Sequence, residues 1–171
     1  MIGGLIALKI EPTLMKQVGH GRRTVPVPGT NGKSTTTRMT AAALETIDKT
    51  VTQADGANMD AGIVAALASD LGAPLAAIEV DELHTPHVAD ALAPEAIVLL
   101  NLSRDQLDRV GEINMIERKL RAGLQRHPDA VIIANCDDVL VTSAAYDNPN
   151  VVWVAAGAGW ANDSVSCPRP G

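Results

Sequence analysis

The sequence predicts an α/β domain built on a mainly parallel, doubly wound sheet. Short apolar runs alternate with helix-compatible segments from about residue 24 onward, which is the pattern of repeated βαβ units. The runs are almost continuously apolar, as expected of strands that helices cover on both faces. Aromatic residues make up only 2% of the chain, so small and branched aliphatic side chains must build the core. In such a sheet the crossovers are right-handed, and a ligand binds beyond the carboxyl ends of the strands.

The expected strands and helices alternate along the chain. Runs such as those from Ile97 to Leu100 and from Val131 to Ile133 are rich in branched aliphatic residues and indicate strands. Expected strands occupy residues 24–27, 50–54, 75–80, 96–101, 130–135 and 151–155. Expected helices occupy residues 33–47, 60–71, 85–92, 113–126 and 137–145. We therefore expect one domain over residues 24–156, followed by a C-terminal loop or tail over residues 157–171.

Residues 1–23 are expected to form an N-terminal helical segment that lies on this domain. An export signal is the alternative, but the stretch lacks a positively charged beginning. Lys9 and Glu11 interrupt the apolar run well short of the roughly 20 residues that a membrane span needs, so no transmembrane segment is expected. If Pro12 ends or kinks the helix, its apolar face comprises Leu5, Leu8, Leu14, Met15 and Val18.

Charge and cysteine content narrow the class of protein further. The formal net charge is −6 and the isoelectric point is near 5.1, which argues against a general nucleic-acid binder. Cys136 and Cys167 are too few for a disulfide framework or a four-thiolate zinc site, so a reduced, cytoplasmic setting is the simplest interpretation. We expect Cys136 to be a small buried residue.

The most informative motif runs from Pro28 to Thr37 and predicts a cradle for a triphosphate. Its glycines allow a tight turn that points successive backbone N–H groups at phosphate oxygens. Lys33 supplies a mobile positive charge for the β- and γ-phosphates, and the Ser34 hydroxyl can ligate Mg²⁺. The general phosphate loop has a glycine at the position of Val27, so an ordinary turn before a helix is the competing interpretation. The expected nucleotide-binding residues are Gly29, Thr30, Asn31, Gly32, Lys33, Ser34 and Thr35.

A run of acidic residues ends the apolar strand predicted at 75–80. Glu79 lies at the carboxyl end of this strand, on the ligand side of the sheet, and could complete the Mg²⁺ shell begun by Ser34. Asp81 and Glu82 compete for this role, because strand alternation points Glu79 and Asp81 to the same side. A solvated turn is the alternative interpretation of all three acids.

Two more polar loops follow strands and should face the same edge. One runs from Asn101 to Arg109, and the other is the Gly-containing loop from Ala54 to Met59. Together, Gly-Thr-Asn-Gly-Lys-Ser at 29–34, Glu-Val at 79–80 and Asn-x-x-x-Asp-x-x-Asp at 101–108 resemble the central ATP-binding domain of the Mur ligase superfamily. Within it the chain is most similar to the MurT subunits. The superfamily's loop lacks the early glycine, so Val27 agrees with it.

The resemblance implies a fold, an activity and partners. It implies a P-loop NTPase-like domain that uses ATP and Mg²⁺, with Lys33 and Glu79 as catalytic residues and with Ser34 and Glu79 as Mg²⁺ ligands. MurT subunits pair with a glutamine amidotransferase-like subunit to form lipid II isoglutaminyl synthase, a peptidoglycan enzyme. The implied reaction activates the D-glutamate α-carboxyl of lipid II as an acyl-phosphate, which ammonia derived from glutamine then amidates.

Several residues depart from the family pattern. Gln106 stands where many Mur ligases have a histidine that helps hold a second Mg²⁺, which puts that metal in doubt. Neither Glu117 nor Lys119 is assigned the role of the family's carbamylated lysine. Cys167 opens a sequence like that of the family's zinc ribbon, but Pro170 occupies the second thiolate position, so no zinc is expected.

A pair of histidines and a pair of prolines each have a possible structural or functional consequence. His84 and His87 could indicate a metal pair, and a surface pair at a helix start is the favoured interpretation. Pro26 and Pro28 lie in the strand before the phosphate loop, and donors two residues apart point the same way. Both missing N–H groups should therefore face one neighbouring strand, which predicts reduced stability or a displaced loop.

The chain ends among loop residues soon after its last expected strand, which favours a truncated domain from a longer parent. The leading hypothesis is the ATP-binding part of an amide-forming ligase subunit. A folate-polyglutamate-type ligase is a second possibility, although that family favours a histidine at the position of Gln106. A truncated, non-catalytic nucleotide-binding remnant is the third.

Overall fold

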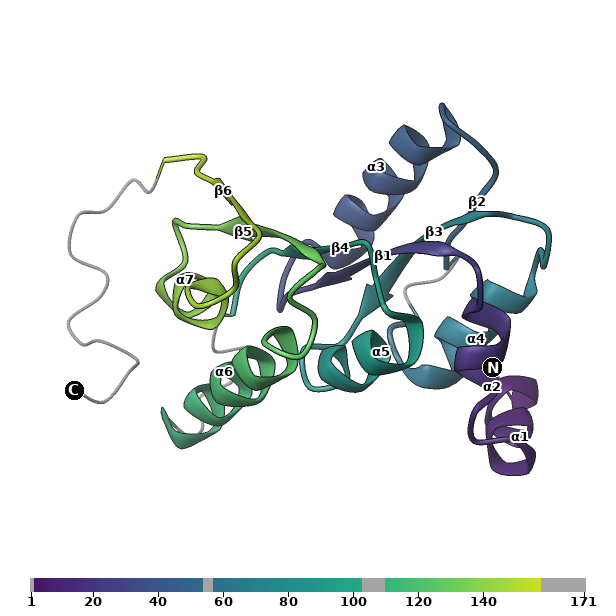
Figure 1. The fold of residues 1–171 in the computed structure, drawn as a ribbon. Coiled ribbons are helices and arrows are strands. Elements are labelled where there is room, and N and C mark those ends of the chain that lie inside the picture. The colour runs from purple at the N-terminus through teal and green to yellow at the C-terminus, as the bar shows by residue number, and fades with distance from the viewer. Residues whose placement is uncertain (1, 54–56, 103–109, 158–171) are drawn as a thin grey trace.

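The computed structural model describes residues 2–53, 57–102 and 110–157. Helices and strands alternate from Arg23 onward, as the sequence predicts, with two additional helices before them (Figure 1). The helices are α1 (Ile2–Ile10), α2 (Leu14–Gly19), α3 (Lys33–Glu45), α4 (Asp60–Ala68), α5 (Thr85–Leu92), α6 (Val110–Leu124) and α7 (Val139–Ala145). The strands are β1 (Arg23–Pro28), β2 (Thr50–Val51), β3 (Leu75–Val80), β4 (Ala96–Leu99), β5 (Val131–Asn135) and β6 (Val151–Val154).

The strands form two parallel ladders that lie side by side. The first ladder has the order β1-β3-β2 and the second has the order β4-β5-β6. Strand β1 runs beside β4, where two backbone hydrogen bonds join the ladders: Glu95 N–H donates to Thr24 C=O at 3.1 Å, and Leu100 N–H donates to Pro28 C=O at 3.1 Å. We call this boundary between β1 and β4 the seam.

The prolines of β1 explain why the seam is not a continuous ladder. In a parallel strand, residues two apart present their backbone groups to the same neighbour. The carbonyls of Thr24 and Pro28 both face β4, so Pro26 and Pro28 lack N–H groups on that side. The predicted common direction of the two missing donors is thereby confirmed. Between these two hydrogen bonds β1 advances four residues, from Thr24 to Pro28, whereas the opposite segment advances five, from Glu95 to Leu100. The register between the two segments therefore shifts by one residue along the seam.

Helices cover both faces, as a doubly wound sheet requires. Figure 1 shows α3 on one face and α4, α5 and α6 on the other. Two separate hydrophobic clusters form the core, one around Ile63, Leu67 and Ile78, the other around Ile97 and Ile132. Helix α5 contributes to both clusters, because Val88 and Leu92 belong to the first and Ala89 to the second.

Local chemistry fixes several element boundaries. Pro12 lies in the turn that divides the N-terminal segment into α1 and α2, which agrees with the predicted break. Asp138 caps α7 by accepting hydrogen bonds from the backbone N–H groups of Leu140 and Val141, so α7 begins two residues later than predicted. Strand β2 ends at Val51, well before the predicted end at residue 54, and Ala54 itself lies outside the described residues.

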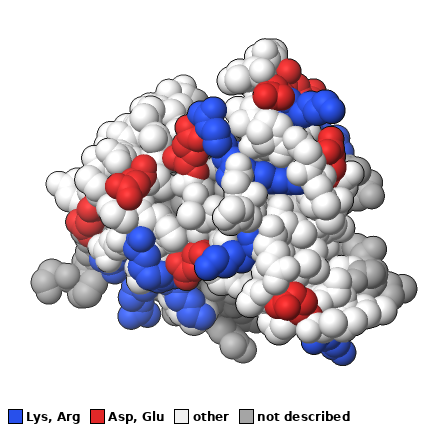
Figure 2. Space-filling view, turned by 45° about the vertical axis from the view of Figure 1, so that its right-hand side comes forward, with Lys and Arg blue, Asp and Glu red and all other residues white. Residues whose placement is uncertain are grey.

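The described surface carries mixed charge. On the face shown in Figure 2, acidic and basic side chains are interspersed among neutral ones. Ion pairs include Arg23 with Glu95 and Arg126 with Asp90, and Arg126 makes the dominant contribution that lowers the pKa of Asp90 below its usual value. Within the described residues, no helix combines the length and apolarity needed to cross a bilayer.

Candidate nucleotide-binding site

The loop between β1 and α3 has the backbone geometry that its glycines permit. Gly32, the N-cap of α3, adopts the left-handed conformation with φ 83° and ψ 0°, which a side chain disfavours. Gly29 has φ 155°, and a Cβ added there would lie 2.7 Å from the Cβ of Leu100, across the seam. Glycine at position 29 therefore lets the loop approach the end of β4 closely.

The loop surrounds a pocket of about 330 Å³ at the carboxyl edge of the sheet. This is the edge where ligands bind in open α/β folds, and the location agrees with the prediction. Six of the seven predicted nucleotide-binding residues line the pocket, and Gly29 lies in the loop directly before them. The lining residues are Thr30, Asn31, Gly32, Lys33, Ser34, Thr35, Asn58 and Glu79.

Lys33 is folded back onto the loop. Its Nζ donates hydrogen bonds to the carbonyl oxygens of Gly29 at 2.5 Å and of Thr30 at 3.0 Å. These carbonyls accept two of the three ammonium N–H groups, and no carboxylate of residues 2–53, 57–102 and 110–157 forms an ion pair with Lys33. A phosphate oxygen offers a charged acceptor, which forms stronger hydrogen bonds with Lys than a neutral carbonyl does. The side chain can therefore turn from the loop to a phosphate group in the pocket.

Ser34 and Glu79 meet across the pocket, as predicted. The Ser34 hydroxyl donates to Glu79 Oε2 at 2.7 Å, and Glu79 is only 5% exposed. The competing acid Asp81 serves the following turn instead, because its carboxylate accepts a hydrogen bond from the Leu83 N–H at 2.9 Å. Among the acids of residues 79–82, only Glu79 lines the pocket.

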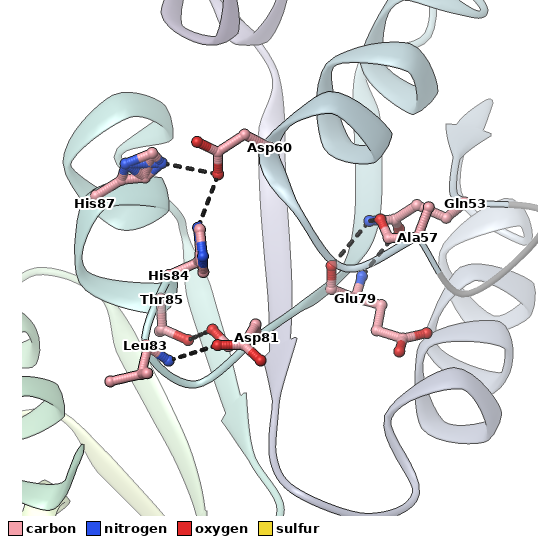
Figure 3. Close-up of polar contacts among 9 residues, drawn as sticks. All are labelled: Gln53, Ala57, Asp60, Glu79, Asp81, Leu83, His84, Thr85 and His87. Carbon is pink, nitrogen blue, oxygen red and sulfur yellow. Dashed lines mark hydrogen bonds and ion pairs between the residues drawn. The ribbon is translucent and has the colours of Figure 1, made fainter. Parts of the chain in front are cut away.

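Gln53 fixes the backbone of Glu79, a role that the sequence pattern did not predict. Its side-chain Nε2 donates to the Glu79 carbonyl at 2.8 Å, and its Oε1 accepts from the Glu79 N–H at 2.9 Å (Figure 3). Because β2 ends at Val51, this amide replaces the strand neighbour that Glu79 would otherwise lack on that side. A glutamine two residues after the end of a short strand could have indicated this role. The predicted strand, however, ran to residue 54 and therefore included Gln53.

Asn101 holds the phosphate loop from the opposite side of the seam. Its Oδ1 accepts from the Asn31 N–H at 2.8 Å, and its Nδ2 donates to the Asn31 carbonyl at 2.9 Å. Its own carbonyl accepts from the Thr30 N–H at 3.0 Å. The prediction that Asn101 faces the ligand edge is confirmed. Residues 103–109, including Gln106, lie outside the described residues, as do Ala54, Asp55 and Gly56.

Five other residues singled out in the sequence lie apart from the pocket lining. Glu117 is 1% exposed between α6 and α7, where the Ser143 hydroxyl donates to its Oε1 at 2.7 Å, and Lys119 is exposed. The expectation that Cys136 is buried is wrong, because the residue follows the end of β5 and is exposed. Both its N–H and its thiol donate to the Val154 carbonyl, at 2.9 Å and 3.4 Å. His84 and His87 lie at the start of α5, as predicted.

Comparisons with known proteins identify relatives of this chain. The chain is 32% identical over 151 residues to the lipid II isoglutaminyl synthase (glutamine-hydrolyzing) subunit MurT of Streptococcus pneumoniae, covering 85% of this chain and 34% of that protein. It is 28% identical over 179 residues to the MurT subunit of Staphylococcus aureus strain COL, covering 98% and 41%. The chain thus spans between a third and about two fifths of the length of these relatives.

Solved structures give the same fold. MurF ligase from Thermotoga maritima, determined in complex with ADP, matches with a TM-score of 0.70 at 19% identity, covering 84% of this chain and 36% of that one. This likeness confirms the predicted doubly wound α/β fold. The Mur ligase middle domain family matches residues 27–163. The chain therefore belongs to the Mur ligase middle domain family.

Proposed function

We propose that this chain is the nucleotide-binding part of an ATP-dependent, carbon–nitrogen bond-forming ligase subunit in peptidoglycan synthesis. The observation that carries the proposal is the contact of Ser34 with Glu79 at 2.7 Å beside the lysine-bearing glycine loop. We divide the chain into an N-terminal helical segment (1–23), the ATP-binding domain (24–156) and a C-terminal tail (157–171). The MurT relatives and the ADP complex of a MurF neighbour support the assignment of nucleotide and class.

The loop offers donors suited to phosphate oxygens. The N–H groups of Lys33, Ser34 and Thr35 belong to the first turn of α3, where a helix supplies no internal acceptors. The same helix end carries a partial positive charge that favours anions. Lys33 would exchange the carbonyls of Gly29 and Thr30 for the β- and γ-phosphates, and would neutralise charge on the transferred γ-phosphoryl group.

Ser34 and Glu79 fit a Mg²⁺ site. Both present oxygen, the ligand type that Mg²⁺ prefers, and Mg²⁺ usually takes one or two protein groups together with phosphate oxygens and waters. When bound, the ion would draw charge from the phosphate oxygens during transfer. Gln53 would then keep the Glu79 carboxylate in place by holding its backbone.

We propose the MurT reaction for the parent protein. In it, the D-glutamate α-carboxylate of lipid II attacks the γ-phosphorus of ATP, and ADP leaves as an acyl-phosphate forms. Ammonia from a glutamine amidotransferase-like partner then displaces phosphate to give the amide. The names of the MurT relatives support this substrate and partner, and a cytoplasmic location at the membrane surface would suit both.

Calorimetric titration of the 171-residue chain with ATP tests the nucleotide assignment. We expect saturable binding that needs Mg²⁺ and that weakens about tenfold or more in Lys33→Ala, since one charge-assisted phosphate contact is worth roughly 1.5–3 kcal/mol. Lys16→Ala, which alters an exposed lysine on α2, is the matched control and should bind like the unaltered chain. Equal binding by both variants would refute the phosphate-loop assignment.

The proposed amidation is tested with a protein of MurT length that contains this chain, because the chain spans only 34–41% of its MurT relatives. Co-purified with its amidotransferase-like partner, that longer protein should convert lipid II to the α-amide in the presence of ATP, Mg²⁺ and glutamine, as read by mass spectrometry. Nucleotide binding with no amidation would leave the ATP site standing and reject the proposed acceptor.

A further inference from the structure

Three side chains of types that can ligate a metal ion converge at the starts of α4 and α5. Asp60 is the first residue of α4, His84 is the N-cap of α5, and His87 follows in the first turn of α5. Asp60 Oδ1 lies 3.1 Å from His84 Nδ1 and 3.0 Å from His87 Nε2 (Figure 3). Both imidazoles therefore direct a nitrogen at the same carboxylate oxygen.

The backbone around this cluster is held by its own hydrogen bonds. The Asp81 carbonyl accepts from the N–H groups of His84 and Thr85, at 3.0 Å each, which fixes the turn that carries the first histidine. The Asp81 N–H donates to the Asn58 carbonyl at 3.1 Å, two residues before Asp60. The two segments that supply the side chains are thus linked to each other, and little rearrangement is needed to bring the ligands together.

The distances suit one ion. All three candidate ligand atoms lie within 4.8 Å of one another. Zinc bonds of about 2.0–2.2 Å in a tetrahedron separate ligand atoms by roughly 3.3 Å, close to two of the three separations here. The rings of His84 and His87 are nearly perpendicular, at 88°, with centroids 5.8 Å apart, so each can present an in-plane lone pair without stacking. Asp60, His84 and His87 are 30%, 31% and 54% exposed, which leaves room for water as a fourth ligand.

We propose that Asp60 Oδ1, His84 Nδ1 and His87 Nε2 form a binding site for a transition-metal ion of the zinc class. Imidazole ligands favour Zn²⁺, Co²⁺, Ni²⁺ and Cu²⁺ over Mg²⁺, which prefers oxygen. The N-terminal ends of α4 and α5 oppose any cation, so binding depends on strong coordinate bonds to nitrogen. This site differs in ligand chemistry from the oxygen pair of Ser34 and Glu79.

A bound ion would tie α4 to α5. Asn58, which lines the phosphate pocket, lies two residues before the metal ligand Asp60. The ion would therefore anchor the segment that closes one side of that pocket. Metal binding itself does not depend on the proposed ligase activity, because the three ligands are outside the pocket lining.

The test is a zinc titration of the 171-residue chain against a competing chromophoric chelator, in a background with Cys136→Ser and Cys167→Ser so that no thiol binds the metal. We expect one Zn²⁺ per chain, with a melting temperature that rises as zinc is added. Replacing zinc with Co²⁺ should produce visible absorption bands of a four-coordinate nitrogen and oxygen site. Absence of stoichiometric binding at micromolar zinc would overturn the proposal.

Matched double variants locate the ion. His84→Asn with His87→Asn should weaken zinc binding by about tenfold or more, whereas His20→Asn with His127→Asn removes the chain's other two histidines and should leave it unchanged. Equal affinity in the two double variants would refute the site.

Two further measurements test whether Asp60 is a ligand and whether the zinc binds at this cluster. Asp60→Asn keeps a hydrogen-bond acceptor for the histidines, so it should preserve the metal-free melting temperature and still weaken zinc binding. Undiminished zinc binding in this variant would count against Asp60 as a ligand. Millimolar Mg²⁺ should not displace the zinc, and displacement would place the ion at Ser34 and Glu79 instead.

Discussion

Gln53→Leu should destabilise the domain far more than an ordinary surface substitution. The leucine keeps much of the side-chain volume but removes both hydrogen bonds to the backbone of Glu79. Gln53 is 7% exposed and Glu79 is 5% exposed, so water reaches the released N–H and C=O groups poorly. Each unsatisfied buried group costs about 1–3 kcal/mol, and partial water entry should hold the total loss to roughly 2–4 kcal/mol.

Urea unfolding followed by circular dichroism measures this loss. For a domain of this size, 1 kcal/mol corresponds to about 2–4 °C, so the melting temperature should fall by roughly 5–15 °C. Gln125→Leu, at an exposed glutamine just after α6, is the matched control and should change the free energy of unfolding by less than about 0.5 kcal/mol. A loss below about 1 kcal/mol for Gln53→Leu would show that its amide does not substitute for a strand.

The same variant separates stability from site geometry. At a temperature where it remains folded, we expect weaker Mg²⁺-dependent ATP binding, because the backbone that aims the Glu79 carboxylate has lost its support. Unchanged nucleotide affinity in the folded variant would mean that β1, which pairs with β3 through Val27 and Glu79, is sufficient to position the carboxylate.

Three other predictions address the seam and the surface. Asn101→Ala removes two hydrogen bonds to Asn31, and should lower the free energy of unfolding by about 1–2 kcal/mol and ATP affinity about tenfold, as measured by urea unfolding and calorimetry. Pro28→Thr restores an N–H facing β4 and should raise the melting temperature by up to about 4 °C, and no gain in either melting temperature or nucleotide affinity would contradict the role given to the missing donor. Hydrogen bonds from Arg126 lower the pKa of Asp90 in the folded state, so this pair stabilises above the unfolded pKa of about 4 and its contribution disappears as pH falls through the folded value. Asp90→Asn should therefore cost about 0.5 kcal/mol at pH 7 and progressively less as the pH falls below about 4, and a cost that does not fall with pH would exclude the ion pair as the cause.

The parts of the fold that depend on local pattern were predictable from sequence. The strand Leu75–Val80 and the helix Thr85–Leu92 have the predicted ends, because a continuous apolar run defines the first and Pro86 favours the start of the second. The position of Glu79 at the pocket was predictable for a topological reason, since the carboxyl ends of parallel strands share one edge. The exposure of Cys136 was mispredicted because its residue type, not its place after a strand, guided the expectation.

The contacts that position the site were harder to foresee, because they join residues far apart in the chain. Gln53 reaches Glu79 over 26 positions, and Asn101 reaches Asn31 over 70. A sequence pattern marks such amides as polar loop residues without saying which backbone they meet. His84 illustrates the same limit, because its pairing with Asp60, 24 positions away, depends on how α4 and α5 pack.

Because no continuous ladder crosses the seam, we expect the two ladders to move relative to each other more readily there than within either ladder. The two ladders, each with its own hydrophobic cluster, meet at β1 and β4, where the N–H groups of Glu95 and Leu100 donate the two hydrogen bonds that join them. The phosphate loop crosses this boundary through its contacts with Asn101. We expect the amide hydrogens of Glu95 and Leu100 to exchange faster than those inside either ladder, and to slow when ATP binds. Because Pro26 and Pro28 remove backbone hydrogen bonds from the seam, bound nucleotide would then help to hold the two ladders together.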